Sequence, residues 1–385
     1  MEAVDLALLE EFGLDPDVLH LNHGAFGVAP IAVRREAEAW RDRAERNPNH
    51  FNSVELPGHV AQARSDAAAW LGVDAEAVGW VRNVSEGASA VLGSLDLGRG
   101  DEIVVCNHGY GAVRMAAEHW AARRGAAVRV ASFPLGAEDD EIIAAFVAAS
   151  GPRSRLVIVD QITSPTATVL PVAAIAAAVG VPVLVDAAHV PGSLQVDIEH
   201  LGVAYWVGNL HKWAFTPRGT ALLWTREDLR PRTPPSVLSW QLHDGYAEAF
   251  DHPGTGDYSG WLAAPAGLDF WTRLGGWEQI DRQSAMLDAA QKQLADVLGT
   301  SLDGLPVTPA PTMRMVRLPD RLFGDGDDSA TRAERQRLSS EYGIQVPTSR
   351  FEGEQVIRIA GAAYNTPEDY ERLADALVAI LAGNS

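Results

Sequence analysis

Residues 181–213 of the chain read VPVLVDAAHVPGSLQVDIEHLGVAYWVGNLHKW, and this stretch decides the fold. It contains two short apolar runs, Val181–Val185 and Ala204–Val207, and polar residues follow each run closely. A short run that is apolar at every position is typical of a strand buried on both faces. Ligands bind at the carboxyl ends of strands in such sheets. We therefore expect a binding site around Asp186 and Lys212, which follow the two runs.

The alternation of helices and apolar strands extends on both sides of this stretch, from about residue 60 to residue 225. It predicts an α/β fold in which helices cover both faces of a mostly parallel sheet. The expected helices here are Leu56–Leu71, Ser85–Leu95, Tyr110–Arg124 and Glu138–Ala149. The further expected strands are Glu102–Cys106, Ala127–Ala131, Arg155–Val159 and Thr220–Trp224.

After about residue 260 the pattern changes to that of a smaller α+β domain. We divide the chain into a large cofactor-binding domain, residues 21–259, and a small C-terminal domain, residues 260–385. An N-terminal segment, residues 1–20, can join the small domain. The small domain is expected to hold helices at Trp261–Leu274, Trp277–Leu298, Ala330–Tyr342 and Pro367–Leu381, and strands at Met313–Leu318, Ile344–Val346 and Gln355–Ile359.

The composition limits the possible classes of function. The 385 residues are 47% hydrophobic and carry a formal net charge of −20, from 31 basic and 51 acidic side chains. This charge argues against binding to nucleic acid or to an anionic membrane, so a ligand phosphate would need a local site. Cys106 is the single cysteine, which excludes an intrachain disulfide and a cysteine-based metal site. The single cysteine fits a reducing cytoplasm, so we expect a cytoplasmic protein, and we expect no metal site. The apolar run Val172–Val185 is shorter than the ~20 residues of a membrane span.

Asp186 and Lys212 together suit a pyridine-ring cofactor. A buried carboxylate keeps the ring nitrogen protonated, which makes the ring an electron sink. A lysine amine can bind such a cofactor covalently and then move protons at the substrate α-carbon. The pair alone is a weak signal, since an aspartate at a strand end is often a simple cap and a lysine usually lies on the surface.

Two further segments add to this pair. Asn83–Gly87 lies where a strand gives way to a helix, and the free N–H groups of a helix start can bind a phosphate. Its alternative role is a plain helix cap. His108 and Tyr110 follow the predicted strand Glu102–Cys106, where either ring could stack on a cofactor or simply pack against a neighbouring helix.

At this point the sequence resembles the class V aminotransferase-fold enzymes, the cysteine desulfurase-like superfamily, which use pyridoxal 5′-phosphate (PLP). Its opening segment and residues 163–167 are most similar to the isopenicillin N epimerase-like branch. The resemblance covers nearly the whole chain and implies the PLP-dependent transferase fold type I. It rests on LNHGAFG (21–27), NVSEG (83–87), NHGYGAVR (107–114), QITSPTA (161–167), DAAH (186–189), NLHKW (209–213), GTGD (254–257) and RIAGAAYN (358–365).

The resemblance implies a role for each matching residue. Lys212 would form the Schiff base and Asp186 would pair with the pyridine nitrogen. His108 would stack on the ring, with Tyr110 as its rival, and His189 with Ser164 or Thr163 would lie near the ring hydroxyl. The phosphate would be held by the Val84 N–H, Ser85, Asn209 and His211. Thr255 would reach the phosphate of the other subunit of a homodimer, Arg358 would bind the substrate carboxylate, and Asn22 and His23 would line the substrate site.

Two positions depart from the pattern of the family. An amide, Asn209, replaces a small hydroxyl residue, and Val84-Ser85 replaces Ala-Thr, so the details of phosphate binding are open. The loop at residues 346–356, VPTSRFEGEQV, lacks the nucleophilic cysteine that a cysteine desulfurase needs. Cys106 ends a predicted buried strand and is expected to be structural. We therefore expect no sulfur transfer through a persulfide.

Three reactions at the α-carbon of an amino-acid-like substrate stay open. Epimerisation is our leading interpretation, and it needs an acid on the face opposite the lysine. The alternatives are β-elimination, including C–S cleavage, and transamination. A non-catalytic binding module of the same fold is disfavoured, because the chain retains Lys212, Asp186 and Arg358 together.

Overall fold

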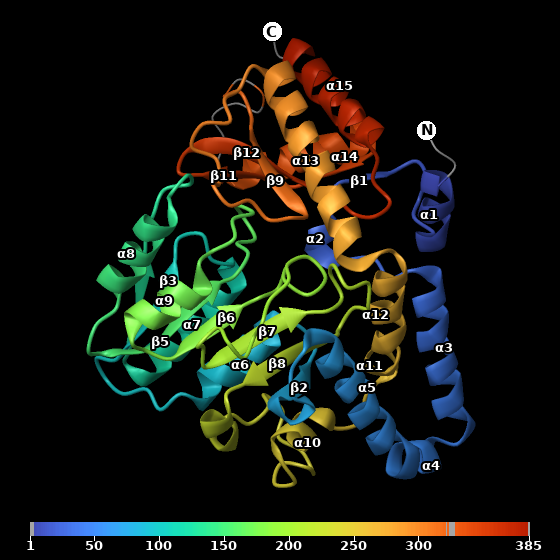
Figure 1. Ribbon diagram of the computed structural model, residues 1–385, viewed down its shortest axis with the longest axis vertical. Helices are drawn as coiled ribbons and strands as arrows, with labels where there is room; N and C mark the ends of the chain where they lie inside the picture. The colour runs from blue at the N-terminus through green and yellow to red at the C-terminus, as the bar shows by residue number, and fades with distance from the viewer. Residues whose placement is uncertain (1–3, 321, 323–327, 384–385) are drawn as a thin grey trace.

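The structure is a computed structural model that describes residues 4–320, 322 and 328–383. A seven-stranded sheet lies at its centre, with the strand order β2-β8-β7-β6-β5-β3-β4 (Figure 1). β3 to β7 run parallel to one another, and β8 is antiparallel to both β2 and β7. This confirms the expected α/β fold. The strands are β2 (Val78–Val81), β3 (Glu102–Cys106), β4 (Ala127–Ala131), β5 (Ser154–Asp160), β6 (Val183–Asp186), β7 (Tyr205–Asn209) and β8 (Ala221–Thr225).

Apolar cores lie on both faces of this sheet, because successive side chains of a strand point to opposite faces. On β5, Val157 and Val159 join one core, whereas Leu156 and Ile158 join the other. The first core includes side chains of α5 (Leu56–Leu71), α8 (Asp139–Ala149) and α9 (Val172–Val179). The second includes side chains of α6 (Val84–Ser94), α7 (Gly111–Arg124) and α10 (Tyr246–Asp251). No helix that the structure describes is both long and apolar enough to cross a membrane.

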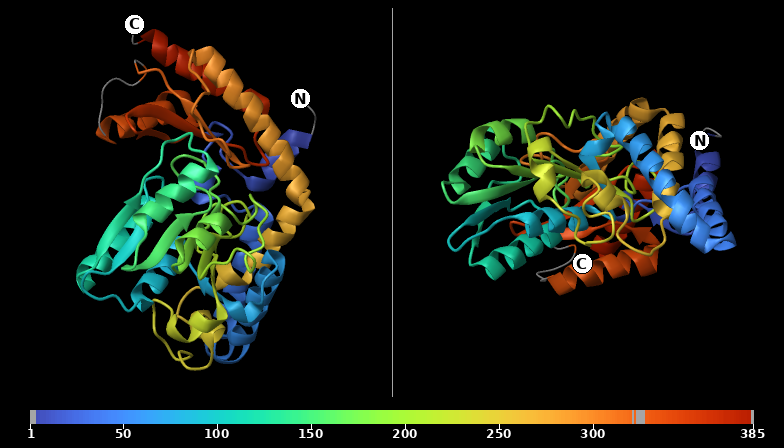
Figure 2. Two further views of the ribbon diagram at one scale, coloured as in Figure 1. Left: turned by 60° about the vertical axis from the view of Figure 1, so that its left-hand side comes forward. Right: turned by 90° about the horizontal axis from the view of Figure 1, so that it is seen from below.

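The small domain is built on a three-stranded antiparallel sheet, β11-β12-β9. The helices α13 and α15 pack side by side on it, as Figure 1 and the left view of Figure 2 show. The short strand β1 (Leu19–His20) pairs with β10 (Ile344–Gln345), which ties the N-terminal segment to this domain. The elements are β9 (Met313–Arg317), β11 (Thr348–Phe351), β12 (Glu354–Ala360), α13 (Gly276–Leu298), α14 (Asp328–Tyr342) and α15 (Pro367–Gly383).

The helices that flank the two domains fix where one ends and the other begins. α11 (Ser259–Leu262) and α12 (Ala264–Arg273) contact α3 (Ile31–Arg46) and α5 of the large domain. These contacts place α11 and α12 against the large domain, and the expected boundary at residue 260 stays a prediction. The remaining short elements are α1 (Val4–Phe12), α2 (His23–Phe26), α4 (Pro48–His50), a π-helical turn at Phe51–Glu55, and 3₁₀ turns at Ala75–Ala77 and Glu227–Arg232.

The N-terminal segment lies directly against the turn that carries Lys212. Gly27 ends α2 with a φ of 63°, and a Cβ atom on it would lie 1.7 Å from the carbonyl oxygen of His211. His23 Nε2 lies 2.8 Å from the carbonyl oxygen of Lys212, and Arg218 donates to the carbonyl oxygen of Gly27 at 3.0 Å. Only glycine permits so close a backbone approach in this conformation. The segment therefore fixes the backbone on both sides of the lysine.

Candidate active site

Lys212 lies in the turn that follows β7, and its side chain is buried. Burial and the nearby Arg358 cation lower the pKa of Lys212 to about 7, while the Asp186 carboxylate opposes them. The amine is therefore largely available as a free base just above neutral pH, which is what a lysine nucleophile requires. The chain contains only one other lysine, Lys292, which lies exposed on α13.

The ring of His189 meets the Lys212 amine, with 3.2 Å between His189 Nε2 and Lys212 Nζ. Trp213 Nε1 donates to His189 Nδ1 at 3.4 Å. A tryptophan N–H can only donate, so the neutral histidine ring carries its proton on Nε2. Burial lowers the pKa of His189 well below its usual value, and the Lys212 cation lowers it further. The histidine thus offers a proton toward the lysine amine and toward any acceptor that binds beside it.

Asp186 is the last residue of β6 and is buried at the carboxyl edge of the sheet. Its Oδ1 accepts from the Ala188 N–H at 3.0 Å, whereas Oδ2 is buried without a hydrogen-bond partner among the described residues. Burial raises the pKa of Asp186 to about 6, against the opposing effects of the Ala188 N–H and Lys212. A buried oxygen that makes no hydrogen bond costs about 1–3 kcal/mol. Oδ2 is therefore suited to an N–H donor that a ligand would supply.

The start of α6 lies at the same edge, beside the end of β7. Asn83 caps the helix by accepting from the Glu86 N–H at 3.0 Å. The Val84 N–H donates to Asn209 Oδ1 at 3.0 Å, which corrects the expectation that this N–H is free for a phosphate. Ser85 and the amide nitrogen of Asn209 stay candidates for that role. His211 Nδ1 lies 3.0 Å from the carbonyl oxygen of Thr220, which directs its Nε2 away from that contact.

The structure also corrects the expected role of His108. Its ring has no exposed surface and packs between Phe133, at 4.2 Å between ring centroids, and Phe351, at 4.4 Å. Its nitrogens bond to Thr166 Oγ1 at 2.9 Å and to the carbonyl oxygen of Phe133 at 3.0 Å. A ring covered in this way has no face left for a cofactor. Tyr110, at the same strand edge, is 44% exposed and becomes the candidate for stacking.

Arg358, on β12, has no acidic partner among the described residues. Its Nη1 donates to the carbonyl oxygen and the Oγ of Ser164, and its Nη2 donates to Asn22 Oδ1 at 3.1 Å. Nε is buried without a hydrogen-bond partner, and burial lowers the pKa of Arg358 to about 10. A buried cation without a counter-charge is costly, so the site is complete only with an anion.

Ser164 and Thr163 have protein partners of their own, and the expected place of either residue near a ring hydroxyl stays a prediction. Ser164 supports Arg358. Thr163 Oγ1 lies 2.6 Å from Thr166 Oγ1 and accepts from the Thr168 N–H at 2.9 Å, so it stabilises its own turn. Of the two, only the partly exposed Ser164 lies next to a group that can bind substrate.

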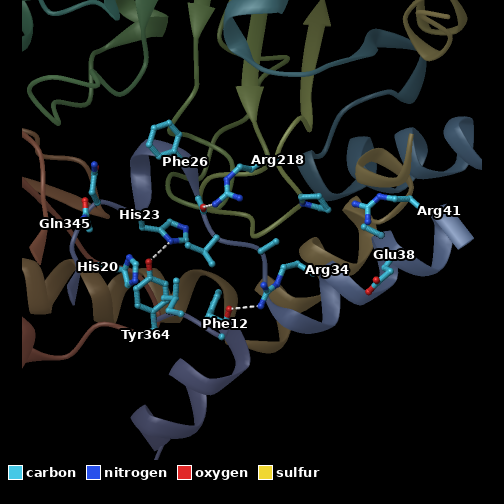
Figure 3. Close-up of a pocket in the computed structure, with 18 residues that line it drawn as sticks. Phe12, His20, His23, Phe26, Arg34, Glu38, Arg41, Arg218, Gln345 and Tyr364 are labelled. Carbon is cyan, nitrogen blue, oxygen red and sulfur yellow. Dashed lines mark hydrogen bonds between the residues drawn. The ribbon is translucent and has the colours of Figure 1, made fainter. Parts of the chain in front are cut away.

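Asn22 and His23 differ in their roles. Asn22 accepts from Arg358 Nη2, and its place at a substrate site stays a prediction. His23 is buried, and its two ring nitrogens contact Tyr364 Oη at 3.0 Å and the carbonyl oxygen of Lys212 at 2.8 Å. It positions the lysine turn and is not free to bind substrate. Both residues border a cavity of about 650 Å³, and Figure 3 shows His23 directed at Tyr364 there, with Arg218 nearby.

Thr255 lies far from these residues in sequence, in an exposed loop after α10. It lines a second cavity of about 650 Å³ together with Arg82 and Glu86, which flank the start of α6. Its expected contact with a second subunit stays a prediction.

The sequence analysis missed Asp160, the last residue of β5. It is buried, and its Cα pairs in register with that of Asp186 on β6. The signal was present, because RLVIVD ends in aspartate just as VPVLVD does. The order of the strands, which sets the two carboxyl groups side by side, could not be read from the chain. No group of three or more acidic, histidine or cysteine side chains that could hold a metal occurs among the described residues.

Several known proteins are similar to this chain in sequence or in structure. Residues 32–373 match the profile of the family Aminotransferase class-V. Isopenicillin N epimerase of Streptomyces clavuligerus is 32% identical over 95% of this chain and 96% of its own. L-cysteine desulfhydrase of Arabidopsis thaliana is 30% identical over 97% of this chain and 92% of its own. A structure of C-DES with glycine covalently linked to its PLP cofactor superposes with a TM-score of 0.80, at 24% identity, over 96% of this chain and 98% of that chain.

The free-base state of Lys212 is measurable, because there are only two lysines to resolve. Nuclear magnetic resonance of cofactor-free protein with isotope-labelled lysine should show two side-chain signals, and the Lys292→Arg variant assigns them. We expect the Lys212 signal to titrate with a midpoint near pH 7, since burial disfavours the charged amine. A midpoint near the ordinary lysine value of about 10.4 would contradict the geometry described above.

Proposed function

The chain belongs to the class V aminotransferase family, and on this premise we propose that it acts at the α-carbon of an α-amino-acid substrate, with epimerisation as the leading reaction. Its cofactor is PLP. The single observation that carries the proposal is the set of buried, incompletely paired charges at one strand edge: the Lys212 amine, Asp186 Oδ2 and the Arg358 guanidinium.

The residues of the site fit the cofactor. Asp186 Oδ2, which has no hydrogen-bond partner in the described part of the chain, suits the protonated pyridine nitrogen. Ser85 at the start of α6 and the Asn209 amide suit the phosphate, because a helix start offers N–H groups and a positive dipole. His189 Nε2, beside Lys212, suits the ring hydroxyl oxygen. When bound, PLP withdraws electrons from the bonds at the substrate α-carbon.

The protein side chains then divide the remaining work. Arg358 binds the substrate carboxylate in the two-pronged geometry of a guanidinium, with Asn22 and Ser164 holding its orientation. Lys212, as a free base, accepts the proton from the α-carbon on its own face. Asp186 keeps its negative charge and so holds the proton of the ring nitrogen. Epimerisation also needs an acid on the other face, and the Tyr110 hydroxyl is our candidate.

C–S bond cleavage is the second candidate, and the similarity to L-cysteine desulfhydrases favours it. It uses the same carboxylate contact and the same proton removal by Lys212, but needs a leaving group on the β-carbon instead of an acid on the other face. Persulfide transfer of the cysteine desulfurase kind finds no support, because the loop before Arg358 carries no cysteine and burial raises the pKa of the Cys106 thiol.

We also propose a homodimer with shared sites. Leu238 and Trp240 are large apolar side chains with 63% and 92% of their surface exposed, which is unusual unless a partner covers them. Thr255 lies in an exposed loop from which it could reach such a partner. Sedimentation that finds a fully active monomer would remove this part of the proposal.

Incubation of amino acids with the protein in deuterated buffer distinguishes epimerisation from C–S bond cleavage by their products. For an epimerase we expect deuterium at the α-carbon and loss of optical purity without ammonia, and for a lyase we expect ammonia with a keto acid. Tyr110→Phe should keep exchange with retained configuration but slow inversion about 100-fold or more, the usual weight of a general acid. Tyr205→Phe is the control, since Tyr205 is buried on β7. Unchanged inversion in Tyr110→Phe would exclude Tyr110 as the acid.

Arg358→Lys tests the carboxylate contact, because it keeps the charge and loses the fork. We expect kcat/KM for α-amino acids to fall about 10- to 100-fold, the effect of one charge-assisted hydrogen bond, with PLP content unchanged. Arg317→Lys is the matched control on β9, where the arginine pairs with Glu354. If the Arg358 variant and the wild type have equal kcat/KM, Arg358 does not bind the substrate carboxylate.

A further inference from the structure

Asp160 is a buried carboxyl group at the active-site edge that the proposed function leaves unused. It is only 4% exposed and ends β5, with its Cα opposite that of Asp186 on β6. Side chains at paired positions of parallel strands point to the same face, so the two carboxyl groups lie next to each other. A second buried acid beside the ring-nitrogen partner is costly, and the protein must gain something from it.

Its contacts connect it to the neighbouring turn. Asp160 Oδ1 accepts from the backbone N–H of Tyr110 at 3.0 Å. The turn also passes very close to the other oxygen, since a Cβ atom on Gly109 would lie 3.1 Å from Asp160 Oδ2. β3 lies beside β5 in the sheet, so the residues that follow Cys106 run across the end of β5. Asn107 and His108 have their own contacts to Phe133 and Thr166, so the carboxyl group of Asp160 anchors the last residue of the turn, Tyr110.

We infer that Asp160 is a positioning residue, whose carboxyl group fixes the turn that holds the Tyr110 ring at the cofactor. The inference rests on the proposed place of Tyr110 beside the cofactor, and it explains what holds Tyr110 there. Tyr110 is the residue before α7, and its side chain makes no cap contact that would fix its position. Its backbone hydrogen bond to Asp160 ties the chain at this residue to the central sheet.

The protonation of the pair agrees with this role. Burial raises the pKa of Asp160 well above its usual value, and the negative charge of Asp186 raises it further. The thiol of Cys106 faces the same carboxyl group from β3, and burial raises its pKa too, so it adds no charge. Both effects favour the protonated form of Asp160, and in either form its Oδ1 accepts from the Tyr110 N–H. Asp186 is left as the charged member of the pair, which the ring nitrogen requires.

Substitutions at Asp160 separate the effect of its hydrogen bond to the Tyr110 N–H from the effect of its charge. Asp160→Asn is neutral, as the protonated acid is, and its amide oxygen can still accept from the Tyr110 N–H. Asp160→Ala removes the acceptor, and Asp160→Val does the same at similar volume in case the alanine variant does not fold. The first readout is the dissociation constant of PLP, measured with cofactor-free protein. The second is the circular dichroism that the protein induces in bound PLP. The melting temperature of the cofactor-free protein checks that each variant folds.

We expect Asp160→Ala or Asp160→Val to raise the PLP dissociation constant about tenfold, the effect of one lost hydrogen bond, and to weaken the induced signal. Asp160→Asn should stay within about threefold of the wild type. In a Tyr110→Ala background the same change at Asp160 should have no further effect on PLP binding, because Asp160 acts on the cofactor only through the Tyr110 ring. Glu102→Ala is the matched control, since Glu102 is a buried acid at the opposite end of β3, paired with Arg153.

Two results would overturn the inference while leaving the place of Tyr110 intact. One is wild-type PLP affinity and dichroism in Asp160→Ala while Tyr110→Ala weakens binding. The other is an Asp160→Asn variant as weak as Asp160→Ala, which would assign the effect to charge. If Tyr110→Ala itself leaves PLP binding unchanged, the proposed place of Tyr110 fails, and the inference with it.

Discussion

Incompletely paired charge, buried at one edge of a sheet, is the constraint on which the rest of the structure depends. Among the described residues, Asp186 Oδ2 has no hydrogen-bond partner and Arg358 has no acidic partner, and the surroundings of Lys212 lower its pKa to about 7. Burial of each of these groups without a full set of partners costs free energy. They become favourable together when a ligand supplies a ring N–H, a carbonyl carbon and a carboxylate. The buried polar groups that lack partners therefore lie together at the proposed binding site.

Three parts of the chain must meet for this arrangement to exist. The central sheet supplies Asp186 and Lys212, the small domain supplies Arg358 from β12, and the N-terminal segment supplies Asn22. The hydrogen bonds of Arg358 to Ser164 and Asn22 join all three. Under the proposed function, cofactor contacts come from the large domain and the substrate carboxylate contact from the small one, so we expect a change in their relative position to alter substrate contacts first.

The parts of the site that follow single strands could be predicted from the sequence. The runs that end at Asp186 and before Lys212 have the length and apolarity of buried strands, and their polar ends mark the binding edge. Contacts between distant segments could not be predicted. His108 was expected on the cofactor because nothing local shows that Phe133 and Phe351 enclose it.

The same limit applies at the start of α6 and at β5. The Val84 N–H was expected to be free, but an amide from residue 209 reaches it across β8. Asp160 was missed because its importance comes from the strand order, which places β5 between β3 and β6.

The central claim is that Lys212 is the covalent attachment point of PLP at this edge. Borohydride reduction of the PLP-loaded protein, followed by digestion and mass spectrometry, locates the attachment directly. Lys212 and Lys292 are the only two lysines of the chain, so the result has two possible sites. We predict a stable phosphopyridoxyl mass on the peptide that contains Lys212, also in the Lys292→Arg variant. The same mass on the Lys292 peptide, or on neither, would contradict this account.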